Sequence, residues 1–380
     1  MDFLRRHQGC HDEIFFGGID NILMKLLIAV YLLIGWCPGV AGAATGRMPV
    51  SIYGVWHCGD DGCSWGQAPS MTEFDRKNHW LIDRGDGKPS VNLVVLSFVN
   101  PMKLLTETTD ATTLKGIPRG MTPDVISYFS RHDIRVMLSI GGLSYVDFWN
   151  QALAESPSQL GLNAADAAVR LGVGIEIDYE EDNTPNLSGL QSFIDAYRSK
   201  LPYDSTGNQS AARLTIDLAP GAYWLTAINR KAAKDWLDIS RPVLDYANAM
   251  VPEHQPPNAD AAIAGWREHI NGISGSAFSM PPIAPCKLTG SLYIVTGKSP
   301  SPECTHFPGS LEDGTGLYVQ TAAPHGAGST PGILGLMFWA AGCPDGRALC
   351  TTPPHTCESG VGEGARHYAI PVPMPPLRQK

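Results

Sequence analysis

The feature that most constrains this chain is the stretch at residues 174–181, which reads Gly-Ile-Glu-Ile-Asp-Tyr-Glu-Glu. This alternation is a β-strand pattern that places the apolar residues on one face and Glu176, Asp178 and Glu180 on the other. Neighbouring acids of the row would lie about 6.5 to 7 Å apart, close enough for their charges to interact. From Leu187 onward the apolar spacing is that of an amphipathic helix, which indicates a βα unit whose strand is covered on both faces. Burying carboxylates costs free energy, and buried acidic side chains are common at functional sites. We therefore interpret the row as a candidate active site.

Seven further short apolar runs, each bounded by polar residues, Gly or Pro, are predicted to be strands, and most are separated by stretches with helical spacing. Thr122 followed by Pro123, for example, is a helix start. Eight strands alternating with helices predict an α/β fold, a single-domain (β/α)8 TIM barrel. An open doubly wound sheet is the alternative, but no Gly-rich phosphate loop follows the first strand. The predicted strands are residues 49–56, 92–99, 135–140, 174–181, 214–218, 244–251, 291–295 and 332–339.

The N-terminal residues predict export. Basic residues precede an apolar run at 26–34, and Ala41-Gly42-Ala43 offers a small-residue cleavage site, as in a secretory signal peptide. An uncleaved signal anchor is the alternative, although the run is short for a membrane span. We expect residues 1–43 to be an N-terminal extension with the signal peptide, 44–342 the barrel and 343–380 a Cys- and Pro-rich tail. The expected location is extracellular, with no membrane association after cleavage.

Net charge bears on the class of binding partner, and the cysteines bear on disulfides and metal binding. The net charge of -9 and the pI near 5.6 argue against nucleic-acid binding, which needs basic patches. In an exported protein the cysteines predict disulfides, with the local pairs Cys58–Cys63 and Cys286–Cys304 favoured. A zinc site in the tail is the alternative, but the spacing matches no standard ligand framework, and its candidate ligands are Cys343, Cys350, His355 and Cys357.

Several motifs, taken together, resemble the family eighteen glycoside hydrolases, the chitinase-type enzymes. Residues 138–142, Leu-Ser-Ile-Gly-Gly, resemble their Ser-x-Gly-Gly motif, and 174–180 resemble their Asp-Gly-x-Asp-x-Asp-x-Glu signature. Residues 92–99, 245–250 and 338–339 match the second, sixth and eighth strands of that family. The resemblance runs in order over roughly residues 49 to 342.

The resemblance implies a reaction as well as a fold. Glu180 aligns with the general acid that protonates the glycosidic oxygen, and Asp178 with the carboxylate that orients the substrate's own N-acetyl group as nucleophile. With Glu176 they form the predicted catalytic set, and such a row is expected to raise at least one pKa and to share a proton. No metal and no organic cofactor is implied.

Substrate contacts are expected where strands end, because catalytic groups of such barrels lie at the carboxyl ends of the strands. Trp339 offers an indole on which the apolar face of a sugar can stack. Tyr53 and Met250 suit either the core or the pocket. The other predicted substrate-binding residues are Glu253, Tyr145 and Asn248.

Three departures from the family pattern bear on activity. Val173 stands where the signature has its first Asp, and Glu176, one methylene longer, stands where it has its second. Pro252 and Glu253 follow the sixth strand where many members have Tyr-Asp. Tyr145 or Tyr223 is a candidate to replace that tyrosine.

The leading hypothesis is a secreted, monomeric glycoside hydrolase that cleaves a β-linked, N-acetylglucosamine-containing glycan of the chitin type with retention of configuration. One alternative is an endo-β-N-acetylglucosaminidase that acts on N-glycans or peptidoglycan. Another is a catalytically silent chitinase-like protein that binds sugars. The short interval between the seventh and eighth strands predicts that no large α+β domain is inserted there.

Overall fold

The structure is a computed structural model that describes residues 51–58, 70–250, 259–275, 278–293, 333–341, 361, 365 and 370–374. Eight parallel strands close into a barrel in the order β1-β10-β9-β8-β7-β6-β5-β2, which confirms the predicted (β/α)8 fold. The strands are β1 (Ile52–Cys58), β2 (Leu93–Val99), β5 (Arg135–Gly141), β6 (Gly174–Asp178), β7 (Leu214–Leu218), β8 (Ala247–Ala249), β9 (Leu288–Tyr293) and β10 (Gly335–Ala341). A separate two-stranded sheet pairs β3 (Thr113–Leu114) with β4 (Ile117–Pro118).

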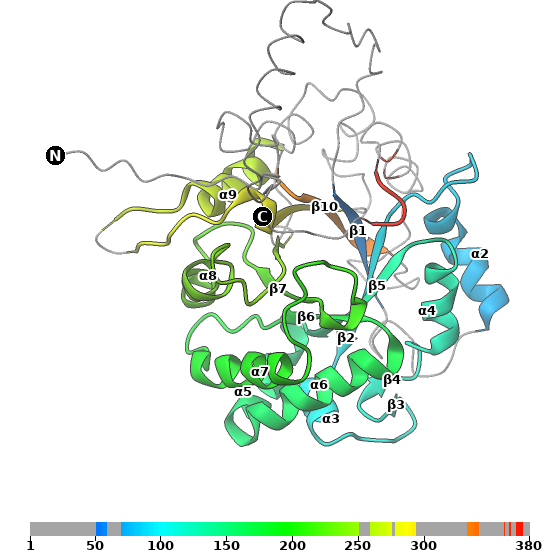
Figure 1. Ribbon diagram of the computed structural model, residues 1–380, viewed down its shortest axis with the longest axis horizontal. Helices are drawn as coiled ribbons and strands as arrows, with labels where there is room; N and C mark the ends of the chain where they lie inside the picture. Colours follow the sequence, from blue (N-terminus) through cyan, green and yellow to red (C-terminus); the bar gives the residue numbers. More distant parts are fainter. Residues whose placement is uncertain are drawn as a thin grey trace, which may run out of the picture.

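Helices surround the barrel, with α5, α6 and α7 grouped on one side and α2 and α4 on another (Figure 1). Thr122 caps α4 as predicted, because its side chain accepts a hydrogen bond from the amide of Val125. The helical stretch expected after β5 is two helices, since Ser156 leaves the helical conformation before Pro157. The α-helices are α2 (Met71–Ile82), α3 (Pro101–Leu105), α4 (Pro123–Ser130), α5 (Val146–Glu155), α6 (Pro157–Leu171), α7 (Leu187–Lys200), α8 (Thr226–Lys231) and α9 (Ala259–Asn271).

Several predicted strand boundaries were wrong by a few residues. The acidic strand ends at Asp178, so Glu180 lies in the loop beyond it. The sixth strand pairs only over Ala247–Ala249, and the seventh begins at Leu288 rather than at Ser291. A run of apolar residues reports burial, whereas a strand boundary is set by pairing with neighbours that the run does not reveal.

Cross-strand register divides each strand into inner and outer residues. Glu176 lies opposite Ser139 on β5 and Thr215 on β7, and Asp217 lies opposite Asn248 on β8. The lower interior is apolar, and the amino ends of the strands surround it. Its buried members are Ile52, Trp56, Leu93, Val95, Met137, Tyr246, Leu334, Met337 and Met374.

The described residues of the C-terminal tail pack against the barrel. The side-chain amide of Asn92, just before β2, donates to the carbonyl oxygens of Ser51 and Pro371, each at 3.0 Å. Met374 is 3% exposed among the inner apolar residues, and its sulfur lies 3.7 Å from a guanidinium nitrogen of Arg213. The predicted tail therefore supplies part of the barrel's base.

A buried ion pair joins α7 to the segment before β8. Arg198 lies 3.1 Å from the carboxylate of Asp245, which also accepts from the amide of Leu214 at 2.9 Å. The nearby Lys287 is fully buried and donates to the carbonyl oxygen of Leu244. These contacts lie toward the amino ends of the strands, away from Glu180.

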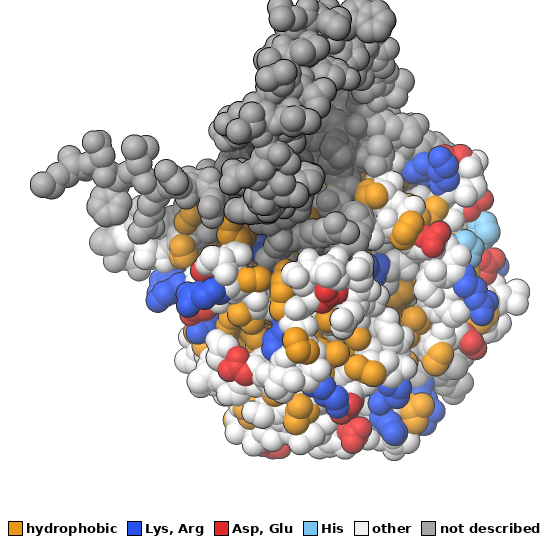
Figure 2. Space-filling view, viewed as in Figure 1, with side chains coloured by type: hydrophobic (Ala, Val, Ile, Leu, Met, Phe, Trp, Pro, Cys, Tyr) orange, Lys and Arg blue, Asp and Glu red, His pale blue; other side chains and the backbone are white. Residues whose placement is uncertain are grey.

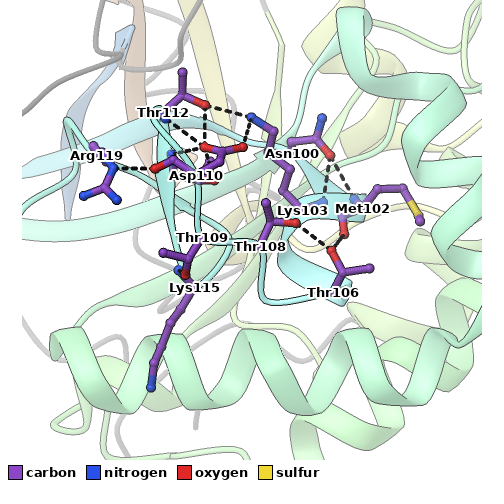
Figure 3. Close-up of polar contacts among 11 residues, drawn as sticks. Asn100, Met102, Lys103, Thr106, Thr108, Thr109, Asp110, Thr112, Lys115 and Arg119 are labelled. Atoms are coloured by element: carbon purple, nitrogen blue, oxygen red, sulfur yellow. Dashed lines mark hydrogen bonds and ion pairs between the residues drawn. The ribbon is translucent and has the colours of Figure 1, made fainter.

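The connection between β2 and α4 is ordered by its own polar contacts (Figure 3). One carboxylate oxygen of Asp110 accepts from the amides and hydroxyls of Thr112 and Thr113 at 2.7 to 3.0 Å. Lys103 lies 3.3 Å from the other oxygen, and Arg119 donates to the carbonyl oxygen of Asp110. Hydrogen bonds from Thr113 and Thr112 lower the pKa of Asp110, so the loop keeps an ionised anchor.

Acidic and basic side chains are interspersed over the described part of the face in Figure 2, without a single-sign patch. None of the helices in the described part combines the length and hydropathy needed to cross a membrane. The predicted signal segment, residues 1–43, lies outside the described residues, as does the interval from 294 to 332. Each predicted cysteine pair also has a member outside them.

Met374→Ala should lower the free energy of unfolding by about 2 to 5 kcal/mol, because it removes a buried side chain from the base of the barrel. Leu114→Ala is the control, since Leu114 is 54% exposed and its truncation should change stability by less than about 0.5 kcal/mol. Urea unfolding of both variants measures the difference. Equal stability of the two variants would show that the tail does not support the barrel.

Candidate active site

Glu176 is fully buried at the centre of the interior and accepts side-chain hydrogen bonds from β1 and β8. The indole nitrogen of Trp56 on β1 donates to its Oε1 at 2.8 Å, and the amide nitrogen of Asn248 on β8 donates to its Oε2 at 2.6 Å. Thr289 on β9 donates to the amide oxygen of Asn248 at 2.6 Å, which orients that amide. Residues of three other strands thus hold the carboxyl group of Glu176, Thr289 acting through Asn248.

Asp217 brings a further carboxyl group from β7. It is 3% exposed, and its Oδ1 accepts from the same Asn248 nitrogen at 3.0 Å. Asp217 also hydrogen-bonds to Glu176 directly. The interior therefore contains an inner pair of acids, Glu176 and Asp217, bridged by one amide.

Asp178, the next acid of the row, is 4% exposed and hydrogen-bonds to Glu180. Its Oδ1 has no hydrogen-bond partner within the described part of the chain. Glu180 is half-buried beyond the end of β6. Asp178 and Glu180 form an outer pair at the carboxyl end of the strand.

Burial controls the protonation of these acids. Burial raises the pKa of Glu176 to about 7, against the lowering effect of hydrogen bonds from Trp56 and the other donors. Burial, and then the charges of Glu180 and Glu176, raise the pKa of Asp178 well above its usual value. Burial and the charges of Glu176 and Asp178 do the same to the pKa of Asp217. The acids therefore keep protons at a pH where exposed carboxyls are ionised.

Gly141, the last residue of β5, and Gly142 after it hold the backbone beside Asp178. The amide of Gly142 donates to the carbonyl oxygen of Asp178 at 2.9 Å, and the indole of Trp149 donates to the same oxygen at 3.0 Å. Gly141 has a φ of 118°, and a Cβ added there would overlap that oxygen and the indole nitrogen. This is the close packing expected of the Ser-x-Gly-Gly motif.

The loop that carries Glu180 is fixed on both sides of it. The hydroxyl of Tyr179 donates to Asn150 at 2.5 Å and accepts from the amide of Asn186 at 3.0 Å. On the other side, Glu181 accepts from the Asn150 amide and from the backbone of Asn183. Glu180 therefore sits between two anchored neighbours.

The structure brings some of the predicted substrate-binding residues to the acidic centre or the strand ends, but not all of them. Asn248 lies in the acidic centre, as described above. Trp339 is half-buried on β10 with its ring 5.5 Å from that of Phe98, and Met250 is half-buried at the end of β8. Tyr145 is half-buried in the 3-10 turn after β5, with its ring 6.0 Å from that of Phe148.

Two predicted residues are not brought to the centre. Tyr53 faces outward, because its neighbour Gly54 is paired with the inner residue Leu93, and its hydroxyl donates to the carbonyl oxygen of Val361 at 2.9 Å. The assignment of Tyr53 to the substrate site is therefore wrong: it is a fully buried core residue. Glu253, with Pro252, lies outside the described residues.

Val173 faces away from the acids as well. It is fully buried in the core between strands and helices, and its amide donates to Ala168 of α6. The missing first Asp of the signature therefore leaves the inner row intact.

Sequence reasoning missed Trp56, Asp217 and Thr289. Asp217 carried a usable signal, since Thr215 and Asp217 alternate with apolar residues on a strand next to the acidic one. Nothing in the apolar run around Trp56 marked its indole as a donor to Glu176. Within the described residues, no group of three or more His, Cys, Asp or Glu is arranged to hold a metal ion.

Solved structures with a similar fold include chitinases. A GH18 chitinase from Pseudoalteromonas aurantia matches with a TM-score of 0.50 and 13% identity, over 76% of this chain and 94% of that one. A chitinase from Rhizomucor miehei matches with a TM-score of 0.48 and 14% identity, over 82% and 99% of the two chains. No protein-family model and no curated protein matches the sequence. The chain thus has a chitinase-like (β/α)8 fold, at a low level of sequence identity.

Gly141→Ala should damage both fold and site, because a methyl group would push the Asp178 carbonyl and the Trp149 indole apart. We expect a loss of about 2 to 4 kcal/mol in unfolding free energy from overpacking and positive φ. Gly87→Ala is the matched control, since Gly87 also has positive φ but has open space around its Cβ position. Denaturant unfolding of both variants separates the cost of overpacking from the cost of a positive φ. Equal losses of unfolding free energy in the two variants would contradict the packing role of Gly141.

Proposed function

We propose that this protein is a secreted glycoside hydrolase that cleaves a β-linked, N-acetylglucosamine-containing glycan of the chitin type, by a substrate-assisted retaining mechanism. The observation that carries the proposal is the outer pair: Asp178 and Glu180 share a hydrogen bond at the carboxyl end of β6, inside a chitinase-like barrel. The extracellular location is part of the proposal and rests on residues 1–43 alone.

General acid catalysis needs a group that stays protonated near neutral pH and reaches the leaving oxygen. Glu180 is the acid of the pair that lies beyond the strand, half-buried and next to the open end of the barrel. The hydrogen bond between Asp178 and Glu180, which raises the pKa of Asp178, keeps a proton between the two acids. Glu180 is therefore the proposed donor to the glycosidic oxygen.

The nucleophile in this mechanism comes from the substrate. The carbonyl oxygen of the N-acetyl group attacks the anomeric carbon and displaces the protonated leaving group, forming a cyclic intermediate that water then opens with retention. Asp178 is suited to accept the N–H of that acetamido group, because its Oδ1 is buried and lacks a partner in the described part of the chain. When the proton held between Asp178 and Glu180 passes to the glycosidic oxygen, the negative charge of Asp178 can stabilise the positive charge that develops on the sugar.

Trp339 is the proposed platform for the sugar ring, since its half-buried indole packs beside Phe98 on an inward-facing position of β10. Tyr145 and Met250 are proposed contacts on the neighbouring strand ends. The protein is expected to act as a monomer on oligosaccharide or polysaccharide.

Glu180→Gln should reduce hydrolysis of N-acetylglucosamine oligomers by at least about a hundredfold, because the amide cannot donate the proton. Asp182→Asn is the control: it removes a nearby charge but keeps the oxygen that accepts from Leu225, and activity should stay within about twofold. A panel of chitin oligomers, N-glycans and peptidoglycan fragments identifies the substrate. Turnover that survives Glu180→Gln would refute the assigned acid.

Binding without turnover by the unmodified protein would instead favour the sugar-binding alternative. Isothermal titration with N-acetylglucosamine oligomers, beside the same assay for Trp339→Ala, measures that outcome. Cleavage of N-glycans or peptidoglycan without cleavage of chitin oligomers would favour the endo-acting alternative.

A further inference from the structure

Asp217 is an acid of the centre that lies outside the acidic strand and outside the motifs that resemble the chitinase-type family. It comes from β7, opposite Asn248 and one step beyond Thr215, the neighbour of Glu176. An isolated buried carboxylate is unstable in such a place unless it is neutralised or paired. Its partners therefore indicate what it does.

The geometry joins Asp217 to Glu176 through one amide group. The nitrogen of Asn248 donates one hydrogen to Glu176 Oε2 at 2.6 Å and the other to Asp217 Oδ1 at 3.0 Å. Thr289 holds the amide oxygen, so the nitrogen stays turned toward both acids. The amide has no further hydrogen to offer, and the two acids hydrogen-bond to each other directly.

Among the described residues, no cation lies within ion-pair distance of this inner pair. None of the ion pairs in the described part of the chain includes Glu176, Asp178 or Asp217. A carboxyl–carboxyl hydrogen bond requires a proton between the two oxygens, because an ionised carboxylate has no hydrogen to donate. A hydrogen bond between Glu176 and Asp217 therefore holds one proton.

We propose that Asp217 is a positioning residue that shares one proton with Glu176 across the Asn248 bridge, and so limits the inner pair to a single negative charge beside Asp178. The inner pair then presents a fixed charge to the outer pair, where the catalytic proton is held. The effect on catalysis rests on the proposed function, whereas the shared proton does not.

The groups that face Asp217 agree with this assignment. Its charged neighbours are the acids of β6, and the facing side chains from the other packed strands are neutral. Arg213, just before β7, and Arg135, the first residue of β5, lie at the base of the barrel. The facing groups are Glu176 and Asp178 from β6, Asn248 from β8, Thr289 from β9 and Trp56 from β1.

The shared proton makes stability depend on pH in a defined direction. The folded pKa values of Glu176 and Asp217 are raised above their unfolded values. Such groups stabilise the fold fully below about pH 4, and that stability is lost as pH rises through the folded pKa, which is about 7 for Glu176. Each proton held by the folded state alone makes the unfolding equilibrium constant rise about tenfold per pH unit.

Asp217→Asn keeps the shape and an acceptor for Asn248 but removes one acid. When the pH is raised from 6.5 to 7.5, the increase in the unfolding equilibrium constant should therefore be about three- to tenfold smaller in Asp217→Asn than in the unmodified protein. Met374→Ala is the control, because it removes a buried side chain but no titratable group, and it should weaken the fold with an unchanged pH dependence. Denaturant titrations at both pH values measure the three proteins, without any substrate.

An equal pH dependence in Asp217→Asn and in the unmodified protein would overturn the proposal. Infrared spectroscopy offers a second measurement if the variant folds poorly: at pH 7 the unmodified protein should show the carbonyl stretch of a protonated carboxyl group. That band should weaken in Glu176→Gln as well as in Asp217→Asn, because either change breaks the pair. No change of the band in either variant would also count against the shared proton.

A third readout tests the positioning role during turnover. The charge of Asp178 raises the pKa of Asp217, so the two acids interact, and ionisation of Asp217 disfavours ionisation of Asp178. Asp217→Asn removes this interaction and should therefore move the alkaline limb of kcat/KM to lower pH. An unmoved limb in an active variant contradicts the positioning role, whereas an inactive unmodified protein contradicts the proposed function and leaves the unfolding result standing.

Discussion

The burial of three carboxyl groups inside a closed barrel is the constraint on which the rest of this structure depends. Glu176, Asp178 and Asp217 are each less than 5% exposed, and no ion pair in the described part of the chain neutralises them. Charged groups in such a place are costly, so the chain must supply hydrogen-bond donors and hold protons. Trp56, Asn248 and Thr289 come from three different strands to do this, and correct register around the barrel is what brings them together.

The interior is consequently divided along its axis. The amino-terminal half is filled by apolar side chains, which Met374 completes from the C-terminal tail, whereas the carboxyl-terminal half contains the acids and their donors. The rigid lower half fixes the ends of the strands that carry the acids. At the upper end, Gly141, Gly142 and Trp149 bind the backbone of Asp178, and Tyr179 and Glu181 anchor the loop around Glu180. The side chain proposed to donate a proton is therefore held from both the strand and the loop.

Sequence alternation predicted the barrel and the direction of the acidic row, because a period of two places Glu176 and Asp178 on one face whatever surrounds them. It could not predict which residues meet across the barrel. Trp56 and Tyr53 lie in one apolar run with no polar face, so nothing indicated that Trp56 points inward and Tyr53 outward. Asp217 was recognisable on its own strand, but its bridge to Glu176 through Asn248 depends on the register of three strands.

Val173 and Glu176, the two departures from the chitinase-type signature on β6 and just before it, differ in how they affect the acidic centre. Val173 is in the outer core, where an apolar residue packs against α6 and a carboxylate would have no partner among the acids. Glu176 differs, because its longer side chain sits in the centre and is met there by Asp217 from the next strand. The two observations are linked: the inner acid has a carboxyl partner from β7 that the signature on β6 does not specify. The proposed activity should therefore depend on the charge of that pair rather than on the residue at position 173.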